Sequence, residues 1–286
     1  MEILVTGNLG FVGSATTQML QAQGHGVYGF DLMNGQDIRD FKQLRKVVKN
    51  IMPDAILHLA AIARFSDADA NPRLCFETNV DGTRNVVKVC ERYHIPLVYA
   101  STGSAIMPLD NYPAPYTEDI PARGNSLYGC SKALGEYIVR EHTPHIILRY
   151  AHIYGAEKRG HGLIGGYVER IQRGLKPRLF GGRQTNDFTF IDDIAQANVK
   201  ALTASWDKWN QTYHIGTGEE LSAAEAGDII CEVLDYDGGI DVVEARTVDP
   251  GRFVFDISKA KRMLGYTPQY TFRDGLAKMM QELGQA

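Results

Sequence analysis

Residues 7–13 constrain the fold of this chain more than any other segment. Glycines stand at positions 7, 10 and 13, after an apolar and β-branched run (1–6) and before a helix-like run (14–23). Glycine lets a backbone turn tightly and approach a pyrophosphate closely. A helix that begins there offers N–H donors and the positive end of its dipole. The segment therefore predicts a strand, a turn and a helix that together bind a dinucleotide.

An acidic residue at the end of the next strand-like run makes this prediction more specific. Asp31 closes the run 26–31, about 20 residues beyond the last glycine, the spacing typical of dinucleotide-binding folds. A carboxylate there accepts hydrogen bonds from the adenosine ribose and repels a 2′-phosphate, so we expect NAD rather than NADP. The alternative is a purely structural turn followed by an incidental strand-end aspartate.

Strand-like and helix-like segments alternate over the first 155 residues. Further strands are expected at 55–60, 97–101 and 146–150, and helices at 40–52, 72–92 and 128–141. This alternation predicts an α/β fold, a Rossmann-type doubly wound parallel sheet with helices on both faces. The pattern loosens after residue 155, where the glycine-rich, charged segment 157–166 reads as a mobile loop.

The looser pattern predicts a smaller, interleaved C-terminal α/β domain. We expect residues 1–155 to form the NAD-binding domain, with a returning segment at about 183–217. Residues 156–182 and 218–286 then form the substrate-binding domain.

Composition excludes several classes of partner. The 286 residues carry 30 basic and 34 acidic side chains, a net charge of −4 that offers no electrostatic basis for nucleic-acid binding. The apolar run 55–62 is short and contains His58, so no membrane span is expected. Met1 and Glu2 lead directly into a strand-like run, so we expect no signal peptide.

The cysteines and histidines show no metal-binding pattern. The four cysteines match no zinc spacing and suit reduced thiols, so we expect a cytoplasmic protein without a metal. His142 and His145 flank Pro144 and are interpreted as a solvated helix end.

A tyrosine and a lysine suggest the chemistry. Tyr128 and Lys132 stand at i and i+4, on one face of the expected helix. A neighbouring ammonium should lower the pKa of the phenol, and a phenolate can take a proton from an alcohol while hydride leaves the same carbon. Thr102, at the end of an expected strand, could hydrogen-bond the reacting oxygen. The alternatives are an ordinary surface contact for the pair and a turn cap for the threonine.

With these features the sequence resembles the extended short-chain dehydrogenase/reductases, in their nucleotide-sugar epimerase/dehydratase branch. The resemblance covers nearly the whole chain. Its matching segments are 6–13, 37–38, 58–61, 79–83, 100–102, 128–132, 148–155, 184–188, 192–193, 213–218, 256–261 and 264–265.

The resemblance implies roles for individual residues. Thr102, Tyr128 and Lys132 would be catalytic, with Tyr128 as the base and Lys132 also clamping the cofactor ribose. NAD would contact Gly7, Asn8, Gly10, Phe11, Val12, Gly13, Asp31, Asp37, Ile38, Leu59, Ala60, Ala61, Asn79, Ser101, Tyr128, Lys132, Tyr150, Ala151 and Ile153. Asp37 and Ile38 would lie at the adenine, and Ala151 and Ile153 along the nicotinamide. A nucleotide-sugar substrate would contact Thr102, His152, Phe180, Asn186, Arg246 and Asp249.

The chain departs from the family pattern in its expected substrate pocket. Gly103 and Ser104 stand where dehydratases usually carry an acid pair, which disfavours elimination. His152 replaces a common asparagine, and Asn186 replaces a common phosphate-binding arginine. Residues 106–107 replace the usual Tyr-Gly.

The sequence therefore predicts an NAD-dependent nucleotide-sugar epimerase, acting at C4 through a transient 4-keto intermediate. One alternative is a net NAD-dependent dehydrogenase or reductase of a sugar or related alcohol. Another is a non-catalytic NAD-sensing protein. The resemblance also implies a homodimer through the helices near 72–92 and 126–141.

Overall fold

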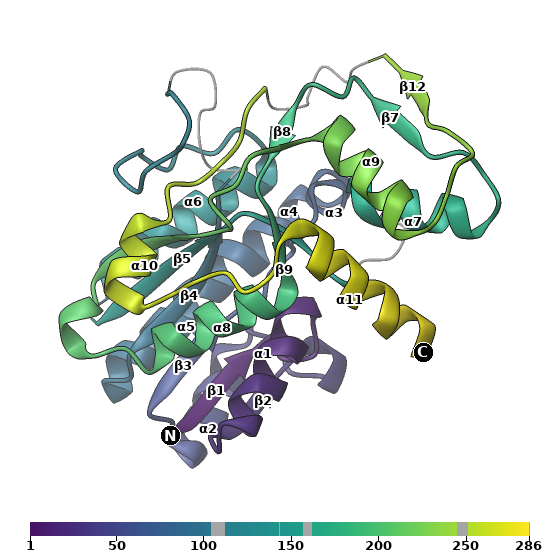
Figure 1. Ribbon diagram of the computed structural model, residues 1–286. Coiled ribbons are helices and arrows are strands. Elements are labelled where there is room, and N and C mark those ends of the chain that lie inside the picture. Colours follow the sequence, from purple (N-terminus) through teal and green to yellow (C-terminus); the bar gives the residue numbers. More distant parts are fainter. Residues whose placement is uncertain (104–111, 143, 157–161, 245–250, 286) are drawn as a thin grey trace.

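A six-stranded parallel sheet forms the centre of the protein (Figure 1). The computed structural model describes residues 1–286 except 104–111, 143, 157–161, 245–250 and 286. The strand order is β10–β5–β4–β3–β1–β2, with every neighbouring pair parallel. The strands are β1 (Glu2–Thr6), β2 (Gly26–Phe30), β3 (Ala55–His58), β4 (Leu97–Thr102), β5 (His145–Tyr150) and β10 (Gln211–Ile215). The predicted Rossmann-type sheet is confirmed.

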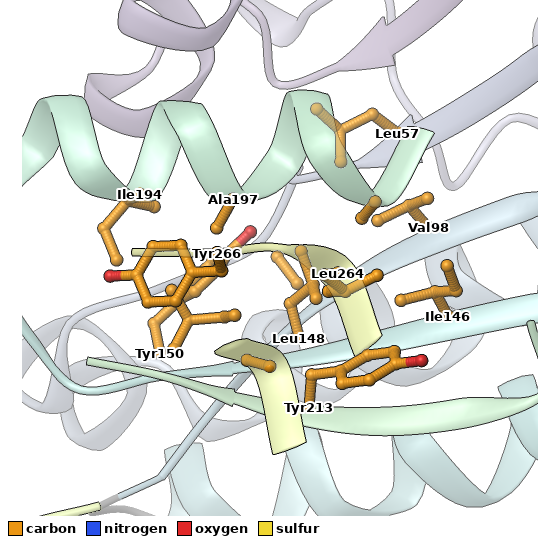
Figure 2. Packing of buried hydrophobic residues seen from close by; sticks show 14 of the residues in the cluster. Leu57, Val98, Ile146, Leu148, Tyr150, Ile194, Ala197, Tyr213, Leu264 and Tyr266 are labelled. Carbon is orange, nitrogen blue, oxygen red and sulfur yellow. The ribbon is translucent and has the colours of Figure 1, made fainter. Parts of the chain in front are cut away.

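Both faces of this sheet are apolar, as expected for parallel strands covered by helices. Along β1, Ile3 and Val5 point into one hydrophobic cluster and Leu4 into the other. The first cluster is covered by α1 (Phe11–Ala22), α8 (Ile191–Leu202) and α10 (Ser258–Leu264). Figure 2 shows its packing, with Ile194 and Ala197 of α8 above Leu148 and Tyr150 of β5. The second cluster is covered by α2 (Phe41–Ile51), α5 (Thr83–Tyr93) and α6 (Leu127–Arg140).

The predicted helix 72–92 contains a widened turn. It comprises α4 (Pro72–Phe76), the π-helical segment η2 (Glu77–Gly82) and α5. Asn71 caps its start by accepting a hydrogen bond from the Leu74 N–H at 3.1 Å. Single π turns inside α-helices are frequent at functional sites, and this one carries Asn79.

The C-terminal part of the chain forms a third hydrophobic cluster, beyond one end of the sheet (Figure 1). Its helices are α7 (Gly162–Gln172), α9 (Ala223–Val233) and α11 (Phe272–Gln285). Short strand pairs accompany them: β6 (His152–Tyr154) with β9 (Phe188–Phe190), β7 (Arg178–Phe180) with β12 (Asp241–Val243), and β8 (Thr185–Asn186) with β11 (Leu221–Ser222). Buried aromatic and aliphatic side chains, including Tyr167, Phe188, Ile230 and Leu276, form its core.

The prediction of a loop over residues 157–166 is wrong for its second half. Residues 162–166 form the first turns of α7, while 157–161 lie outside the described residues. Ile164 and Gly165 are buried, and Ile164 packs in the C-terminal core, so tertiary burial overrides the weak helix propensity of a glycine-rich segment.

Three short elements complete the described chain: η1 (Leu32–Asn34), α3 (Phe65–Ala70) and η5 (Trp206–Lys208). No helix within the described ranges is both long enough and apolar enough to cross a membrane.

The glycine turn supplies a test of this packing. A Cβ placed on Gly13 would lie 2.0 Å from the Gly7 carbonyl oxygen and 2.7 Å from Asn8 Cα. These are backbone atoms that cannot move aside cheaply, so we expect Gly13→Ala to lower the free energy of unfolding by about 2–4 kcal/mol. Gly166, inside α7, has open space at its Cβ position. Gly166→Ala is the matched control and should stabilise the protein by about 0.5–1 kcal/mol in denaturant unfolding. Equal effects of the two substitutions would contradict the contact.

Candidate active site

The carboxyl ends of β1 and β3 lie side by side where the strand order reverses, which is where open α/β sheets bind ligands. Gly7 follows β1 with φ +73°, and a Cβ there would lie 2.8 Å from the Ala60 backbone nitrogen. The turn closes through a hydrogen bond from the Gly10 N–H to the Gly7 carbonyl at 3.1 Å. Gly10 then begins α1 without a side chain that could occupy its amino end. This cradle fits the pyrophosphate of a dinucleotide.

Asp31 is held against this turn at the end of β2. Its carboxylate accepts hydrogen bonds from the backbone N–H groups of Leu9 at 3.0 Å and Met33 at 2.9 Å. The residue is 8% exposed, and it joins the glycine turn to η1. The carboxylate expected to bind the adenosine ribose therefore lies beside the predicted pyrophosphate cradle.

Asp37 and Ile38 are the residues expected at the adenine; Asp37 is half-buried, whereas Ile38 is buried. The guanidinium of Arg39 donates to both carboxylate oxygens of Asp37, and this contact lowers the pKa of that carboxyl. Ile38 is buried, and its side chain fills the space where a Cβ on Gly82 would lie.

A buried polar chain fixes the end of β3. The Ala60 N–H donates to Thr6 Oγ1 at 3.3 Å, and Thr6 Oγ1 lies 2.7 Å from His58 Nδ1. His58 Nε2 lies 3.0 Å from Thr83 Oγ1, which donates to the Asn79 carbonyl. Because the Thr83 proton is already used, His58 must donate through Nε2 and accept from Thr6 through Nδ1. Burial lowers the pKa of His58 to about 3, which keeps the ring neutral.

Asn79 links this region to α6. Its amide accepts from the Ile62 N–H at 2.8 Å and donates to the Ile62 carbonyl at 2.9 Å and to Ser131 Oγ at 2.9 Å. The asparagine therefore holds the segment after β3, which contains the half-buried Leu59, Ala60 and Ala61, against the helix that carries Tyr128.

The structure brings Thr102, Tyr128 and Lys132 together. Thr102 ends β4, and Tyr128 and Lys132 lie one turn apart in α6, whose start is capped by Ser126. The Thr102 side chain lies beside the Tyr128 phenol and acts to lower its pKa, and the rings of Phe65 and Tyr128 meet edge to face with 5.5 Å between centroids. A tyrosine, a hydroxyl partner and a lysine thus meet at the carboxyl edge of the sheet.

The expected lowering of the Tyr128 pKa is not found. Burial raises the pKa of Tyr128 to about 12, although the Thr102 side chain opposes this. Burial also lowers the pKa of Lys132 to about 7, against the attraction of Glu136. The Lys132 ammonium lies 4.2 Å from the centroid of the Tyr99 ring. Desolvation therefore outweighs the effect that the sequence suggested.

Two of the residues expected to contact the cofactor turn their side chains into the protein interior. The Ser101 hydroxyl donates to Glu136 Oε1 at 2.6 Å, and the Tyr150 hydroxyl donates to Asn198 Oδ1 at 2.6 Å. Ala151 is buried beside them, and its N–H donates to the Ile215 carbonyl at 2.8 Å. Ile153 is half-buried in β6.

Residues expected on the substrate side surround the first short strand pairs. His152 is exposed, and its ring and that of Phe188 meet edge to face with 5.2 Å between centroids. Phe180 ends β7, and Asn186 pairs with Leu221 in β11. Arg246 and Asp249 lie outside the described residues.

Sequence reasoning did not identify Phe255, which closes the position after Thr102. A Cβ on Gly103 would lie 1.9 Å from Phe255 Cζ. The ring is 1% exposed and stacks on His214 with 4.0 Å between centroids, so it has no free space to move into. A side chain at position 103, where the dehydratases that the sequence resembles carry an acid, would have to displace the Phe255 ring; Ser104 lies outside the described residues.

The interpretation of His142 and His145 as a solvated helix end is wrong: the two side chains are only 3% and 6% exposed, and both rings contact backbone carbonyls. His145 Nδ1 lies 2.5 Å from the His142 carbonyl oxygen, and His142 Nε2 lies 3.2 Å from that of Ile95. Among the described residues, no group of three His, Cys, Asp or Glu side chains is arranged to hold a metal.

The buried lysine predicts a pH dependence of stability. Lysine titrates near 10.4 in an unfolded chain, and in the folded protein the pKa of Lys132 is about 7. Between these values the unfolded chain binds more protons, so this lysine makes wild-type stability rise with pH. Lys132→Met removes the titration. We expect the stability of wild type relative to Lys132→Met to rise from pH 7 to pH 9.5, by up to about 1.4 kcal/mol per pH unit. Denaturant unfolding at each pH measures this stability difference, and Lys46→Met, at an exposed lysine, is the charge-matched control. A difference between wild type and Lys132→Met that does not change with pH would contradict the lowered pKa of Lys132.

Comparison with known proteins agrees with this arrangement. Residues 3–216 match the family model described as NAD dependent epimerase/dehydratase family. A Methanocaldococcus jannaschii protein provisionally named UDP-glucose 4-epimerase is 32% identical, over 97% of each chain. The Thermotoga maritima UDP-glucose 4-epimerase, solved with UDP-glucose, superposes with a TM-score of 0.92 at 26% identity, over 100% of this chain and 99% of that one. The Thermus thermophilus UDP-glucose 4-epimerase, solved with NAD, gives 0.87 at 27% identity over the whole of both chains.

The family match spans most of the chain and includes the glycine turn, Thr102, Tyr128 and Lys132. The solved structures share the fold over its full length. The chain therefore belongs to the NAD-dependent epimerase/dehydratase family, within the extended short-chain dehydrogenase/reductases.

Proposed function

We propose that this chain is an NAD-dependent epimerase that inverts C4 of a nucleotide-activated sugar, with a UDP-sugar as the first candidate. The observation that carries the proposal is the contact of Tyr128 with Thr102, one helical turn from Lys132 and beside a dinucleotide cradle. The names of the similar proteins support a UDP-hexose as substrate.

The residues present fit NAD. Gly7, Gly10 and Gly13 leave the backbone open to a pyrophosphate, and Asp31 is placed for the adenosine ribose. When bound, NAD supplies the hydride acceptor and donor. Lys132 would bind the nicotinamide ribose, and Asn79 would hold the neighbouring segment in place. We assign the cofactor contacts of Asn8, Phe11, Val12, Asp37, Ile38, Leu59, Ala60, Ala61, Ser101, Tyr150, Ala151 and Ile153 on the family pattern.

Proton transfer falls to Tyr128 and Thr102. Thr102 would hydrogen-bond the C4 oxygen. Tyr128 would act as the phenolate, after its phenol has given its proton to solvent, and would take the C4 hydroxyl proton as hydride leaves the same carbon. The resulting 4-keto sugar would turn in the pocket. Its C4 would then receive the hydride on the opposite face, while Tyr128 returns the proton to the oxygen. The reaction consumes no external oxidant or reductant, because the substrate and product are isomers and the hydride and proton both return to the sugar.

The substrate pocket would be formed by the C-terminal part. We assign His152 and Asn186 to the phosphate side of the substrate, Phe180 to its base, and Arg246 and Asp249 to its diphosphate and ribose. Residues 1–155 and 183–217 would form the cofactor domain, and 156–182 and 218–286 the substrate domain. The separate hydrophobic core formed by α7, α9 and α11 supports this division.

Two other outcomes of the same oxidation are less well supported. Elimination needs a general acid beside the keto sugar, and such a side chain at Gly103 would have to displace the Phe255 ring. A net dehydrogenase or reductase would suit the altered residues His152 and Asn186, but the similar proteins reported above are named as epimerases.

An exposed apolar face on α6 supports the homodimer through residues 72–92 and 126–141. Leu134 and Tyr137 are 43% and 58% exposed on this helix, and Leu127 begins it at 37%. Such apolar patches mark interaction surfaces, and sedimentation velocity measures the oligomeric state. We also propose a cytoplasmic location, supported by the free thiols of all four cysteines.

Replacement of the base tests the mechanism. In Tyr128→Phe the ring and its packing remain, but the oxygen that takes the proton is lost. We expect turnover of UDP-glucose or UDP-galactose to fall at least 10³-fold, an effect typical of removing a general base, while NAD affinity changes less than threefold. Tyr28→Phe, in edge strand β2, is the matched control and should keep wild-type turnover. Near-normal turnover by Tyr128→Phe would show that another group transfers the proton.

A further inference from the structure

A buried carboxylate lies behind the catalytic face of α6. Glu136 is 0% exposed and stands one helical turn beyond Lys132 and two turns beyond Tyr128. It accepts hydrogen bonds from Ser101 Oγ at 2.6 Å, from Arg149 Nε at 2.9 Å and Nη2 at 2.8 Å, and from Arg140 Nη2 at 2.7 Å. Both carboxylate oxygens are therefore occupied.

These contacts join α6 to the two strands that end at the site. Ser101 in β4 and Arg149 in β5 are register partners across the sheet, so their side chains leave the same face. Glu136 thus joins α6, which carries Tyr128, to Ser101. Ser101 is the neighbour of Thr102, whose hydroxyl lies beside the Tyr128 phenol.

Joining α6 to the sheet through buried charged groups costs desolvation free energy. Arg149 is 1% exposed, and burying two charges costs as much as or more than their attraction returns, so a hydrophobic pair would hold the helix equally well. Arg149 Nη1 also donates to the Ile120 carbonyl at 3.2 Å, so the guanidinium is fixed in place on both sides. This cost points to a role in the site beyond packing.

Glu136 is also the negative charge that acts on Lys132. Its attraction opposes the desolvation that lowers the pKa of Lys132. The other titratable groups facing this ammonium come from the neighbouring elements β3, α4, β4 and α6. They are His58, which is neutral, Cys75, Tyr99 and Tyr128.

We propose that Glu136 is a positioning residue for the proton transfer: it fixes α6 against β4 and β5 so that Tyr128 meets Thr102, and its negative charge attracts the Lys132 ammonium one helical turn away. This inference rests on the proposed epimerase function. It assigns a role in the reaction to a residue that does not touch the substrate.

The first variant is Glu136→Gln, which keeps the shape and removes the charge. We expect kcat to fall at least 30-fold, with KM for the sugar and NAD affinity changed less than threefold. Without the carboxylate, Lys132 loses its proton more readily, so the alkaline limb of the kcat profile should move to lower pH by at least one unit. Glu141→Gln, an exposed acid just after the same helix, is the matched control. A kcat within twofold of wild type for Glu136→Gln would overturn the proposal.

A second variant separates positioning from folding. Glu136→Gln leaves Arg149 buried without its counter-charge and will lower Tm, whereas Glu136→Leu with Arg149→Met removes both charges. We expect this double variant to recover a Tm within about 3 °C of wild type but to keep at least a tenfold loss of kcat. Recovery of kcat together with Tm would show that the network only supports the fold.

The titration of Lys132 tests the inference independently of turnover. NMR of ¹³Cε-labelled lysine, assigned with Lys132→Met, should give a midpoint at least one pH unit lower in Glu136→Gln than in wild type. An unchanged midpoint would overturn the electrostatic role. A wild-type protein that interconverts no nucleotide sugar would contradict the proposed function, whereas the lysine midpoint would still decide whether Glu136 controls this charge.

Discussion

The backbone of the glycine turn packs against the end of β3 too closely for any side chain. Gly7 stands where a Cβ would meet the Ala60 backbone, and Gly13 where one would meet the Gly7 carbonyl. This contact brings the ends of β1 and β3 together where the strand order reverses, and it aims the start of α1 at the space between them. The helices on both faces and the position of Asp31 follow from that arrangement, because each is fixed relative to these strands.

A second set of contacts completes the site from the other half of the sheet. α6 presents Tyr128 to Thr102, and its inner face is joined to β4 and β5 through Glu136 and Arg149. The cofactor cradle depends on backbone atoms, whereas the reacting groups depend on buried charge. Substitutions in the two halves should therefore fail differently, the first through lost NAD binding and the second through lost proton transfer.

Local sequence patterns were enough to predict the glycine turn and the first five strands of the sheet, though not β10, and the family resemblance grouped Tyr128 with Thr102. What they could not supply depends on distant contacts. The start of α7 is helical because the C-terminal core buries it, and the pKa of Tyr128 rises because its surroundings exclude water. Glu136 had a visible signal, its position four residues after Lys132, but its partners in β4 and β5 are remote in the sequence. Phe255 reaches Gly103 across some 150 residues of chain, a contact that no periodicity predicts.

The most direct test of the central claim is NMR of the purified protein with UDP-glucose or UDP-galactose and no added cofactor. Anomeric signals distinguish the two sugars, and tightly held NAD would be recycled within each turnover. The account predicts that the 4-epimer appears and reaches equilibrium without any added NAD. Conversion that requires added NAD and leaves NADH behind, or the absence of conversion of either sugar, would contradict it.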